Sequence, residues 1–233
     1  MAKTFGVIIP AAGSGTRFGQ DKLSYDLLGH PVLWHTLQAF EQAKTVSYIV
    51  IPTRKESLCF VKELSREFSK VIAVVEGGKT RQESVKNGME ALPEVDFVSI
   101  HDGARPLILP EEIDRLHRNA VKYGAICAGT PVVDTIQQVD GEGIIIATPD
   151  RSSLVAAATP QVFERIAYRD ALCRISESHT DDAGLYRAAG GQVKMILCQG
   201  DNFKITTKED AVRAQQILLR RTEREMSDDS AVN

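Results

Sequence analysis

The amino-acid sequence predicts an α/β domain with a mostly parallel sheet flanked by helices and a projecting β-hairpin arm. Short apolar runs alternate with segments of helical period, and the connections between them are short. A hairpin pattern at 131–151 belongs to no strand–helix unit. Strands that alternate with helices through short connections are typical of a parallel or mostly parallel sheet.

Four apolar runs are expected to form buried strands: GVIIP (6–10), SYIVIP (47–52), VIAVVE (71–76) and FVSIHD (97–102). They are rich in β-branched residues and lack strict alternation, as expected of strands that are covered on both faces.

Helical spacing of apolar residues fills the segments between these strands, at 54–68, 80–91 and 110–123. Thr80 and Glu83 stand at the spacing of a capping box. Pro110 sits in the first turn of its helix with Glu111 and Glu112, where proline and acidic residues are favoured.

The pattern changes after Thr130. Two strand-like runs surround the turn at 140–143, so the segment is expected to leave the main sheet as an arm. The chain then returns to helices at about 160–175 and 181–189, a strand at 193–197, a helix from about 207, and a polar tail over 224–233 that is expected to be disordered.

Composition excludes several classes of protein. The 233 residues hold 28 Lys and Arg against 31 Asp and Glu, a net charge of −3 that does not suit a broadly basic nucleic-acid binder. The four cysteines stand alone, without the spacing of a zinc knuckle or redox pair. No signal peptide or membrane-length apolar stretch is present, so a soluble, cytoplasmic protein is expected.

The segment PAAGSGTRFG (10–19) directly follows the first strand, and Arg17 and Lys22 add positive charge to it. Its glycines leave backbone N–H groups free to converge on an anion. The spacing fits neither the dinucleotide-binding fingerprint nor the P-loop, so a phosphate-cradling loop of another kind is expected. The alternative is a tight strand-to-helix turn with two solvated bases.

Two further strand ends carry polar residues. After the third strand, Gly77 and Gly78 lead to Arg81 and Ser84 at the start of the capped helix, where an anion is favoured. Taken alone, however, a plain strand-to-helix turn is the better explanation of this segment. After the fourth strand, Asp102 stands where α/β sheets bind ligands and has the chemistry to hold a divalent cation. The alternative is that Asp102 caps a turn and Arg105 forms a salt bridge.

Four later residues have strong structural explanations. Thr159 and Thr180 look like helix N-caps, the first before a proline and the second before two aspartates, while Arg151 and Lys204 look like solvated charges. The cysteines and histidines show neither a nucleophile pairing nor metal-ligand spacing, which disfavours hydrolase and zinc chemistry.

The ordered series PAAGSGTRFG, Lys22, EGGKTRQESV, HDGARP, PVVDT, DR, TPQ, TDDA and GDNFKIT resembles the 2-C-methyl-D-erythritol 4-phosphate cytidylyltransferase family over residues 6–210. The resemblance implies one Rossmann-like nucleotidyltransferase domain over 1–233, with 132–158 as an arm that clasps a second subunit in a homodimer. Gly103 stands where the family commonly has alanine, and Lys79 where it commonly has aspartate.

The same resemblance implies the site residues. CTP would be bound by Pro10, Ala11, Ala12, Gly13, Gly15, Arg17 and Lys22, and its base and ribose would lie near Gly78, Arg81 and Ser84. Asp102 would hold Mg²⁺ beside Gly103 and Arg105. Methylerythritol phosphate would be held by Thr135, Arg151, Thr159, Thr180 and Lys204, with Arg151 serving either its own or the neighbouring subunit's site.

The implied reaction is transfer of CMP from CTP to methylerythritol phosphate in non-mevalonate isoprenoid synthesis. The acceptor phosphate is already an anion and needs no general base, so Arg17, Lys22, Arg151 and Lys204 would act by offsetting the repulsion between two polyanions. Two alternatives remain open: a cytidylyltransferase that acts on ribitol 5-phosphate, and a non-catalytic nucleotide-binding regulatory module on the same fold.

Overall fold

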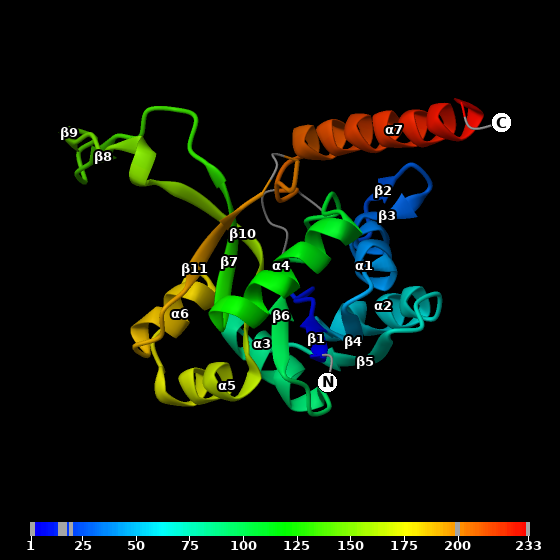
Figure 1. Ribbon diagram of the computed structural model, residues 1–233, viewed down its shortest axis with the longest axis horizontal. Helices are drawn as coiled ribbons and strands as arrows, with labels where there is room; N and C mark the ends of the chain where they lie inside the picture. Colours follow the sequence, from blue (N-terminus) through cyan, green and yellow to red (C-terminus); the bar gives the residue numbers. More distant parts are fainter. Residues whose placement is uncertain (1–2, 14–17, 19–20, 199–200, 232–233) are drawn as a thin grey trace.

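A seven-stranded sheet forms the centre of the molecule in the computed structural model, which describes residues 3–13, 18, 21–198 and 201–231 (Figure 1). The strand order is β11-β7-β10-β6-β1-β4-β5. The strands are β1 (Phe5–Ile8), β4 (Val46–Thr53), β5 (Val71–Glu76), β6 (Phe97–Ile100), β7 (Ala125–Pro131), β10 (Val155–Glu164) and β11 (Lys194–Leu197).

All pairs in this sheet are parallel except those of β10, which runs antiparallel to both β6 and β7. The predicted mostly parallel sheet is therefore confirmed. Because β1, β4, β5 and β6 run in one direction, the loops that follow them emerge at one edge of the sheet. That edge is where polar residues were expected to gather.

Helices cover both faces of the sheet and create two apolar cores. On one face pack α1 (Val32–Gln42), α2 (Leu58–Ser65), α4 (Pro110–Tyr123) and α7 (Lys208–Ala231), and on the other α3 (Arg81–Ala91), α5 (Arg165–Arg174) and α6 (Asp182–Ala188). Val7 belongs to the first core and Ile8 to the second, because successive strand side chains point to opposite faces.

The arm projects from the main body, as predicted (Figure 1). It carries a small antiparallel hairpin of β8 (Gln138–Val139) and β9 (Ile145–Ala147), followed by a 3-10 turn at Arg151–Ser153. Asp140 closes the hairpin turn, since its Oδ1 accepts the backbone N–H groups of Glu142 and Ile144.

Residues 160–164 correct the sequence prediction, because they form the end of β10 instead of the start of a helix. The Thr159-Pro160 pair resembles a helix start but lies inside the strand, so Thr159 is not an N-cap. Hydrogen bonding to β6 and β7 on both sides outweighs the local preference. At α6 the N-cap is Asp181, not Thr180, and its side chain accepts the N–H of Gly184.

Other boundaries also differ from the sequence prediction. The segment expected to be helical over 54–68 begins with a 3-10 turn at Lys55–Ser57, and α2 ends at Ser65. Helix α7 continues to Ala231 through most of the expected tail at 224–233. Polar composition predicts exposure to solvent, but it does not by itself prevent a helix, and half of residues 224–231 (Arg, Glu, Met and Ala) are good helix formers.

The sequence patterns did not predict α1, β7 or the short hairpin of β2 (Asp26–Leu27) and β3 (His30–Pro31).

Within the part of the chain that the structure describes, no helix combines the length and apolar character that crossing a bilayer demands.

The capping box of α3 gives a testable prediction. Thr80 Oγ1 accepts the N–H of Glu83, and the Glu83 carboxylate accepts the N–H of Thr80, as predicted. We expect Thr80→Ala to lower the free energy of unfolding by about 1 kcal/mol in urea denaturation, because Ala leaves a helix N–H without a partner. Thr80→Ser keeps the acceptor and is the control; equal stability of the two variants would contradict the assignment.

Candidate functional site

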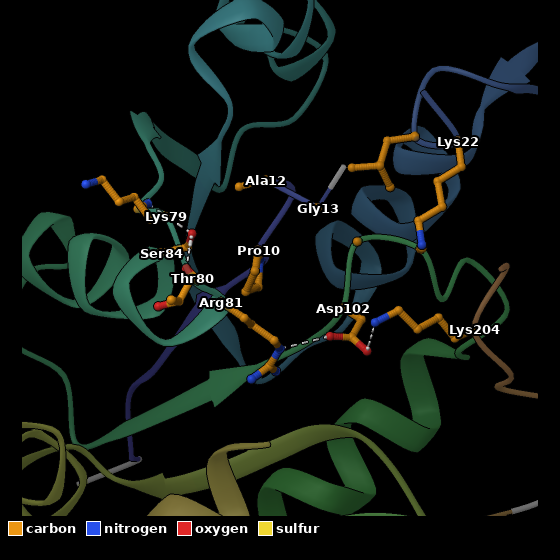
Figure 2. Close-up of a pocket in the computed structure, with 14 residues that line it drawn as sticks. Pro10, Ala12, Gly13, Lys22, Lys79, Thr80, Arg81, Ser84, Asp102 and Lys204 are labelled. Atoms are coloured by element: carbon orange, nitrogen blue, oxygen red, sulfur yellow. Dashed lines mark hydrogen bonds and ion pairs between the residues drawn. The ribbon is translucent and has the colours of Figure 1, made fainter. Parts of the chain in front are cut away.

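Two neighbouring cavities open at the carboxyl edge of the parallel strands. The first, of about 430 Å³, is lined by Pro10, Ala12, Gly13, Lys22, Leu23, Gly78, Lys79, Thr80, Arg81, Ser84, Asp102, Gly103, Ala104 and Lys204 (Figure 2). The second, of about 280 Å³, is lined by Arg81, Asp102, Arg105, Ala157, Ala158, Thr159, Gln161, Thr180, Asp181 and Lys204. Arg81, Asp102 and Lys204 line both cavities, so the two spaces meet at these side chains.

The end of β1 supplies one wall of the first cavity. Ala11 donates its N–H to the carbonyl of Pro52, 2.7 Å away, which continues the parallel pairing with β4 past the end of β1. Ala11 itself is buried and does not line the cavity, whereas Pro10, Ala12 and Gly13 do. The loop therefore starts from a fixed point on the sheet.

Gly77 and Gly78 are required by close packing at the end of β5. A Cβ on Gly77 would lie 2.9 Å from the Cβ of Ala12, and a Cβ on Gly78 would overlap Glu83. Ser84 Oγ accepts the N–H of Gly78 and donates to the carbonyl of Thr80. Ser84 thus lines the first cavity while its hydroxyl holds the glycine loop against α3.

Lys22 reaches the first cavity from a segment that is tied to the sheet. The Asp21 carboxylate accepts the N–H of Leu23, and its other oxygen lies 2.9 Å from Nη2 of Arg54, just past the end of β4. Arg54 and Asp21 therefore hold the turn that presents Lys22.

Asp102 lies at the centre of the two cavities and contacts three cations. Its Oδ1 is 3.3 Å from Nε of Arg81, and its Oδ2 is 3.1 Å from Nζ of Lys204 (Figure 2). The same Oδ2 is 3.3 Å from Nε of Arg105. These cations come from α3, from the loop after β6 and from the segment before α7. The predicted salt bridge of Arg105 is confirmed, with Asp102 as its partner. Asp102 also faces the cavities, and its role in holding a divalent cation stays a prediction.

The pKa values of this cluster follow from burial and charge. Burial by itself raises the pKa of the Asp102 carboxyl, but Arg81, Lys204 and Arg105 outweigh it and hold that pKa well below its usual range. Burial by itself lowers the pKa of Arg81, and Asp182 and Asp102 reverse this and raise it. Asp102 and Arg81 are therefore both charged at neutral pH.

Arg81 is anchored from behind by a second carboxylate. Its Nη1 lies 2.7 Å from Oδ2 of Asp182 on α6, and Oδ1 of Asp182 accepts the hydroxyl of the buried Tyr168, 2.6 Å away. Because a guanidinium held on two sides keeps one orientation, Arg81 presents a fixed charge at the junction of the cavities.

Several predicted site residues do not line either cavity. Thr135 and Arg151 lie on the arm, where Nη1 of Arg151 donates to the carbonyl of Val133. Gly15 and Arg17 lie outside the described residues. Thr159 and Thr180, by contrast, line the second cavity.

Gly103 stands where the family commonly has alanine. A Cβ at this position would lie 3.3 Å from Cδ1 of Leu33, so an alanine would need only a small adjustment of its neighbours.

Sequence reasoning missed several lining residues, namely Leu23, Lys79, Thr80 and Ala104 in the first cavity and Ala157, Ala158, Gln161 and Asp181 in the second. Gln161 donates to Oδ2 of Asp181 at 2.9 Å and accepts the N–H of Ala183 at 2.8 Å, which fixes its amide at the cavity wall. Gln161 lies in the segment TPQ and Asp181 in the segment TDDA. Their positions in the sequence do not show that they meet; only the tertiary structure brings the two side chains into contact.

His101 is buried and directly precedes Asp102, and sequence reasoning assigned no role to it. Burial lowers its pKa to about 4, so the imidazole is neutral near pH 7. Asp102 and Arg105 are the charged groups beside it, with opposite effects on that pKa.

The charge balance of the first cavity suits a polyanion. Four cationic side chains line it, those of Lys22, Lys79, Arg81 and Lys204, against the carboxylate of Asp102 alone among its described lining residues. No group of three or more metal-ligating side chains gathers within the described ranges. A divalent cation held here would need oxygens from a ligand as well as from Asp102, which is how Mg²⁺ binds with phosphates.

Comparison with known proteins gives one consistent result. Residues 5–220 match the family model of the 2-C-methyl-D-erythritol 4-phosphate cytidylyltransferases. The enzyme of that name from Prochlorococcus marinus is 40% identical over 228 residues, with 92% of this chain and 98% of the relative covered. The one from Desulforamulus reducens is 42% identical over 224 residues, with 92% and 95% covered.

Solved structures agree with the sequence relatives. The 4-diphosphocytidyl-2C-methyl-D-erythritol synthase of Anaerococcus prevotii superposes with a TM-score of 0.84 at 28% identity, covering 94% of this chain and all (100%) of that one. The 2-C-methyl-D-erythritol 4-phosphate cytidylyltransferase of Thermus thermophilus gives a TM-score of 0.76 at 28% identity, with 93% and 98% covered.

The lowered pKa of Asp102 predicts how stability responds to acid. Since its folded pKa lies below its unfolded value of 3.8, its ionisation stabilises the fold above about that pH. This contribution is lost as the pH falls toward the folded pKa. In acid-titration unfolding below about pH 4, Asp102→Asn should lose stability less steeply than the wild type, by up to about 1.4 kcal/mol per pH unit. If the free energy of unfolding falls with the same slope in the two proteins as the pH is lowered, the assignment is contradicted.

Proposed function

The chain belongs to the 2-C-methyl-D-erythritol 4-phosphate cytidylyltransferase family, and from this we propose that it transfers CMP from CTP to methylerythritol phosphate, with release of pyrophosphate. The observation that carries the proposal is the junction of the two cavities at Arg81, Asp102 and Lys204. A transfer between two phosphate-bearing substrates requires two binding spaces that meet at the reacting phosphates. The reaction belongs to non-mevalonate isoprenoid synthesis.

CTP is assigned to the first cavity. The glycine-bearing ends of β1 and β5 allow backbone N–H groups to approach phosphates, and the N-terminus of α3 favours negative charge nearby. Lys22 and Lys79 line this space on opposite sides of the loop at Ala12 and Gly13 (Figure 2). Arg17 is assigned to the same phosphates on its place in the motif.

Methylerythritol phosphate is assigned to the second cavity. Arg105 and Lys204 supply positive charge there, and Thr159, Gln161 and Thr180 supply the polar wall. A short polyol phosphate carries one anionic end and several hydroxyl groups, which matches this division of the lining.

The chemistry follows from the position of the charges. A phosphate oxygen of the acceptor attacks the α-phosphorus of CTP, a new P–O bond forms, and the bond from the α-phosphorus to the bridging oxygen breaks. Pyrophosphate leaves with the electron pair, and no proton transfer is required. Lys22 and Arg81 stabilise the charge that develops on the nucleotide phosphates, while Lys204 holds the acceptor phosphate in line.

Magnesium is part of this proposal. The buried carboxylate of Asp102 faces both cavities and, together with phosphate oxygens of the substrate, fits the oxygen ligands that Mg²⁺ prefers. When bound, the ion neutralises phosphate charge as the leaving group departs. Arg81 and Arg105 would keep the carboxylate oriented toward it.

We also assign the arm to a homodimer. The arm exposes apolar side chains at Val133, Val139 and the run Ile144–Ile146, each at least half exposed. Contiguous exposed apolar side chains favour burial against another surface. A second copy of the chain would cover them and bring Arg151 and Thr135 to a neighbouring site. We also assign the protein to the cytoplasm, because its free cysteines suit a reducing compartment.

The first functional experiment compares acceptors. With CTP and Mg²⁺, we expect pyrophosphate release with methylerythritol 4-phosphate and little with ribitol 5-phosphate, because the family assignment favours the first acceptor. Pyrophosphate release is measured with both acceptors in parallel, with a sample lacking Mg²⁺ as the control for the metal. Turnover of ribitol 5-phosphate alone would replace the proposed acceptor, and CTP binding without turnover of either would favour a regulatory module.

Mixing of two inactive variants tests whether the arm acts in the partner's site. Lys22→Ala and Arg151→Ala should each reduce kcat/KM by roughly 100- to 1,000-fold, the usual cost of one preorganised charge contact. If the arms are exchanged, each mixed dimer contains one intact site, and mixing should restore up to about a quarter of wild-type activity. Co-purification of one untagged variant with the other, affinity-tagged variant confirms that the dimers have exchanged. No recovery of activity after exchange would show that each subunit uses its own arm.

A further inference from the structure

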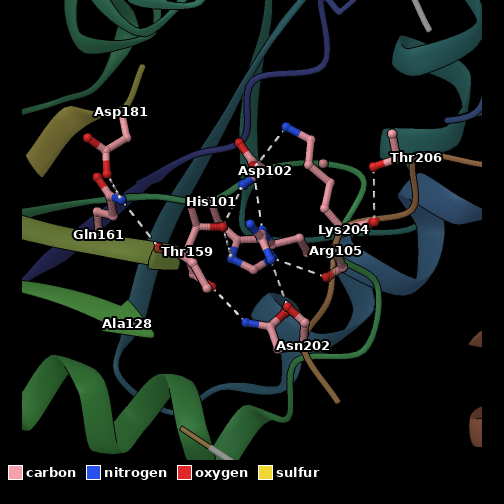
Figure 3. Close-up of polar contacts among 12 residues, drawn as sticks. His101, Asp102, Arg105, Ala128, Thr159, Gln161, Asp181, Asn202, Lys204 and Thr206 are labelled. Carbon is pink, nitrogen blue, oxygen red and sulfur yellow. Dashed lines mark hydrogen bonds and ion pairs between the residues drawn. The ribbon is translucent and has the colours of Figure 1, made fainter. Parts of the chain in front are cut away.

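His101 is a buried imidazole that connects three segments of the site (Figure 3). It follows β6 and directly precedes Asp102, and its ring makes a polar contact on each side. Nε2 lies 3.1 Å from the carbonyl oxygen of Arg105, and Nδ1 lies 3.1 Å from Oγ1 of Thr159 on β10. β6 and β10 pair at Ile100 and Gln161, which places Thr159 beside the residues that follow β6.

The partners of the ring determine where its proton lies. A carbonyl oxygen can only accept, so Nε2 carries the hydrogen and donates to Arg105. Nδ1 of the neutral ring is then an acceptor, and the hydroxyl of Thr159 donates to it. The contacts of His101 therefore select one tautomer and one orientation of the Thr159 hydroxyl.

This orientation limits what Thr159 can do for a ligand. Its Oγ1 also accepts the N–H of Asp102 at 3.0 Å, so its one hydrogen and one of its two lone pairs are used within the protein. The remaining lone pair can accept a hydrogen bond from a hydroxyl group. It cannot donate to a phosphate oxygen while His101 holds its hydrogen.

The same network reaches Arg105 and the segment that carries Lys204. The side chain of Asn202 donates from Nδ2 to the backbone carbonyl of Thr159 at 2.7 Å, and the backbone carbonyl of Asn202 accepts from Nη1 of Arg105 at 2.8 Å (Figure 3). Lys204 is two residues further along the chain. His101 thus contacts the loop after β6 and the centre of β10 directly, and both of these contact the segment before α7 through Asn202.

We propose that His101 is a positioning residue for the acceptor, acting through the Thr159 hydroxyl and the Arg105 backbone, and that Thr159 recognises a hydroxyl of the polyol and not its phosphate. This inference rests on the proposed function. Thr159 and Arg105 line the second cavity but are absent from the described lining of the first. Loss of His101 should therefore disturb the acceptor more than CTP.

The kinetic test uses His101→Phe, which keeps a ring but removes both polar contacts, and His101→Gln, which can still donate to the Arg105 carbonyl. We expect kcat/KM for methylerythritol phosphate to fall by about 10- to 100-fold in His101→Phe, the range for losing a buried hydrogen bond. KM for CTP should stay within about twofold of the wild-type value. His101→Gln should keep part of the lost activity.

Thr159→Val tests the route of the effect. Because His101 acts through the Thr159 hydroxyl, we expect the double variant His101→Gln/Thr159→Val to be no worse than Thr159→Val alone. If the fold-loss of kcat/KM in the double variant equals the product of the losses in the two single variants, His101 does not act through Thr159, and that part of the proposal is overturned.

His117 provides a matched control elsewhere in the fold. It is also fully buried, its Nδ1 contacts Oγ1 of Thr45 at 2.7 Å, and its ring stacks on Phe5. His117→Phe should change the thermal unfolding temperature and leave both KM values unchanged. If His101→Phe behaves like His117→Phe, or raises KM for CTP and for the acceptor equally, His101 has no positioning role.

A structural readout separates this inference from the proposed reaction. In ¹⁵N-histidine NMR of the wild-type protein near pH 7, His101 should show a protonated Nε2 and an unprotonated Nδ1. A protonated Nδ1 would overturn the network whatever the enzyme turns over. The expected tautomer together with no turnover of methylerythritol phosphate would show that the proposed reaction, and with it the acceptor role of His101, is wrong.

Discussion

The carboxylate of Asp102 is the group on which the arrangement of the site depends. Three cations from separate parts of the chain, Arg81, Arg105 and Lys204, lie within 3.3 Å of its two oxygens. Without the carboxylate, three positive charges would face one another in a partly buried space, where repulsion is stronger than in water. Asp102 thus allows positive charge to be concentrated beside two cavities before any ligand arrives.

The parallel sheet makes this concentration of charge possible. β1, β5 and β6 end at one edge, so the loop at Pro10–Gly13, the glycine pair at 77–78 and the segment at 101–105 converge there. β10 enters the same edge in the opposite direction, which brings Thr159 against the residues that follow β6. A strand that paired in the parallel sense would present its other end at this position.

The overall charge of −3 conceals the local balance that matters for function. Cationic side chains outnumber carboxylates at the first cavity, and buried partners such as Asp182 and Tyr168 fix the orientation of Arg81. Fixed charges need little reorganisation when phosphates bind, and such preorganised charges accelerate transfer between two polyanions.

The sequence by itself determined the features that depend on neighbouring residues: the four strands, the capping box at Thr80, the helix that begins at Pro110 and the hairpin of the arm. Burial of the strand at 71–76 was predicted wrongly, because β5 lies at the edge of the sheet and none of its residues is buried. It also determined most of the charged residues of the site through their motifs. Only the tertiary structure decided that 160–164 is a strand, that Gln161 meets Asp181, and that Lys204 reaches Asp102. Local patterns report periodicity and capping over a few residues. These three outcomes depend on partners distant in the sequence, whose pairing gains more than the local preference costs.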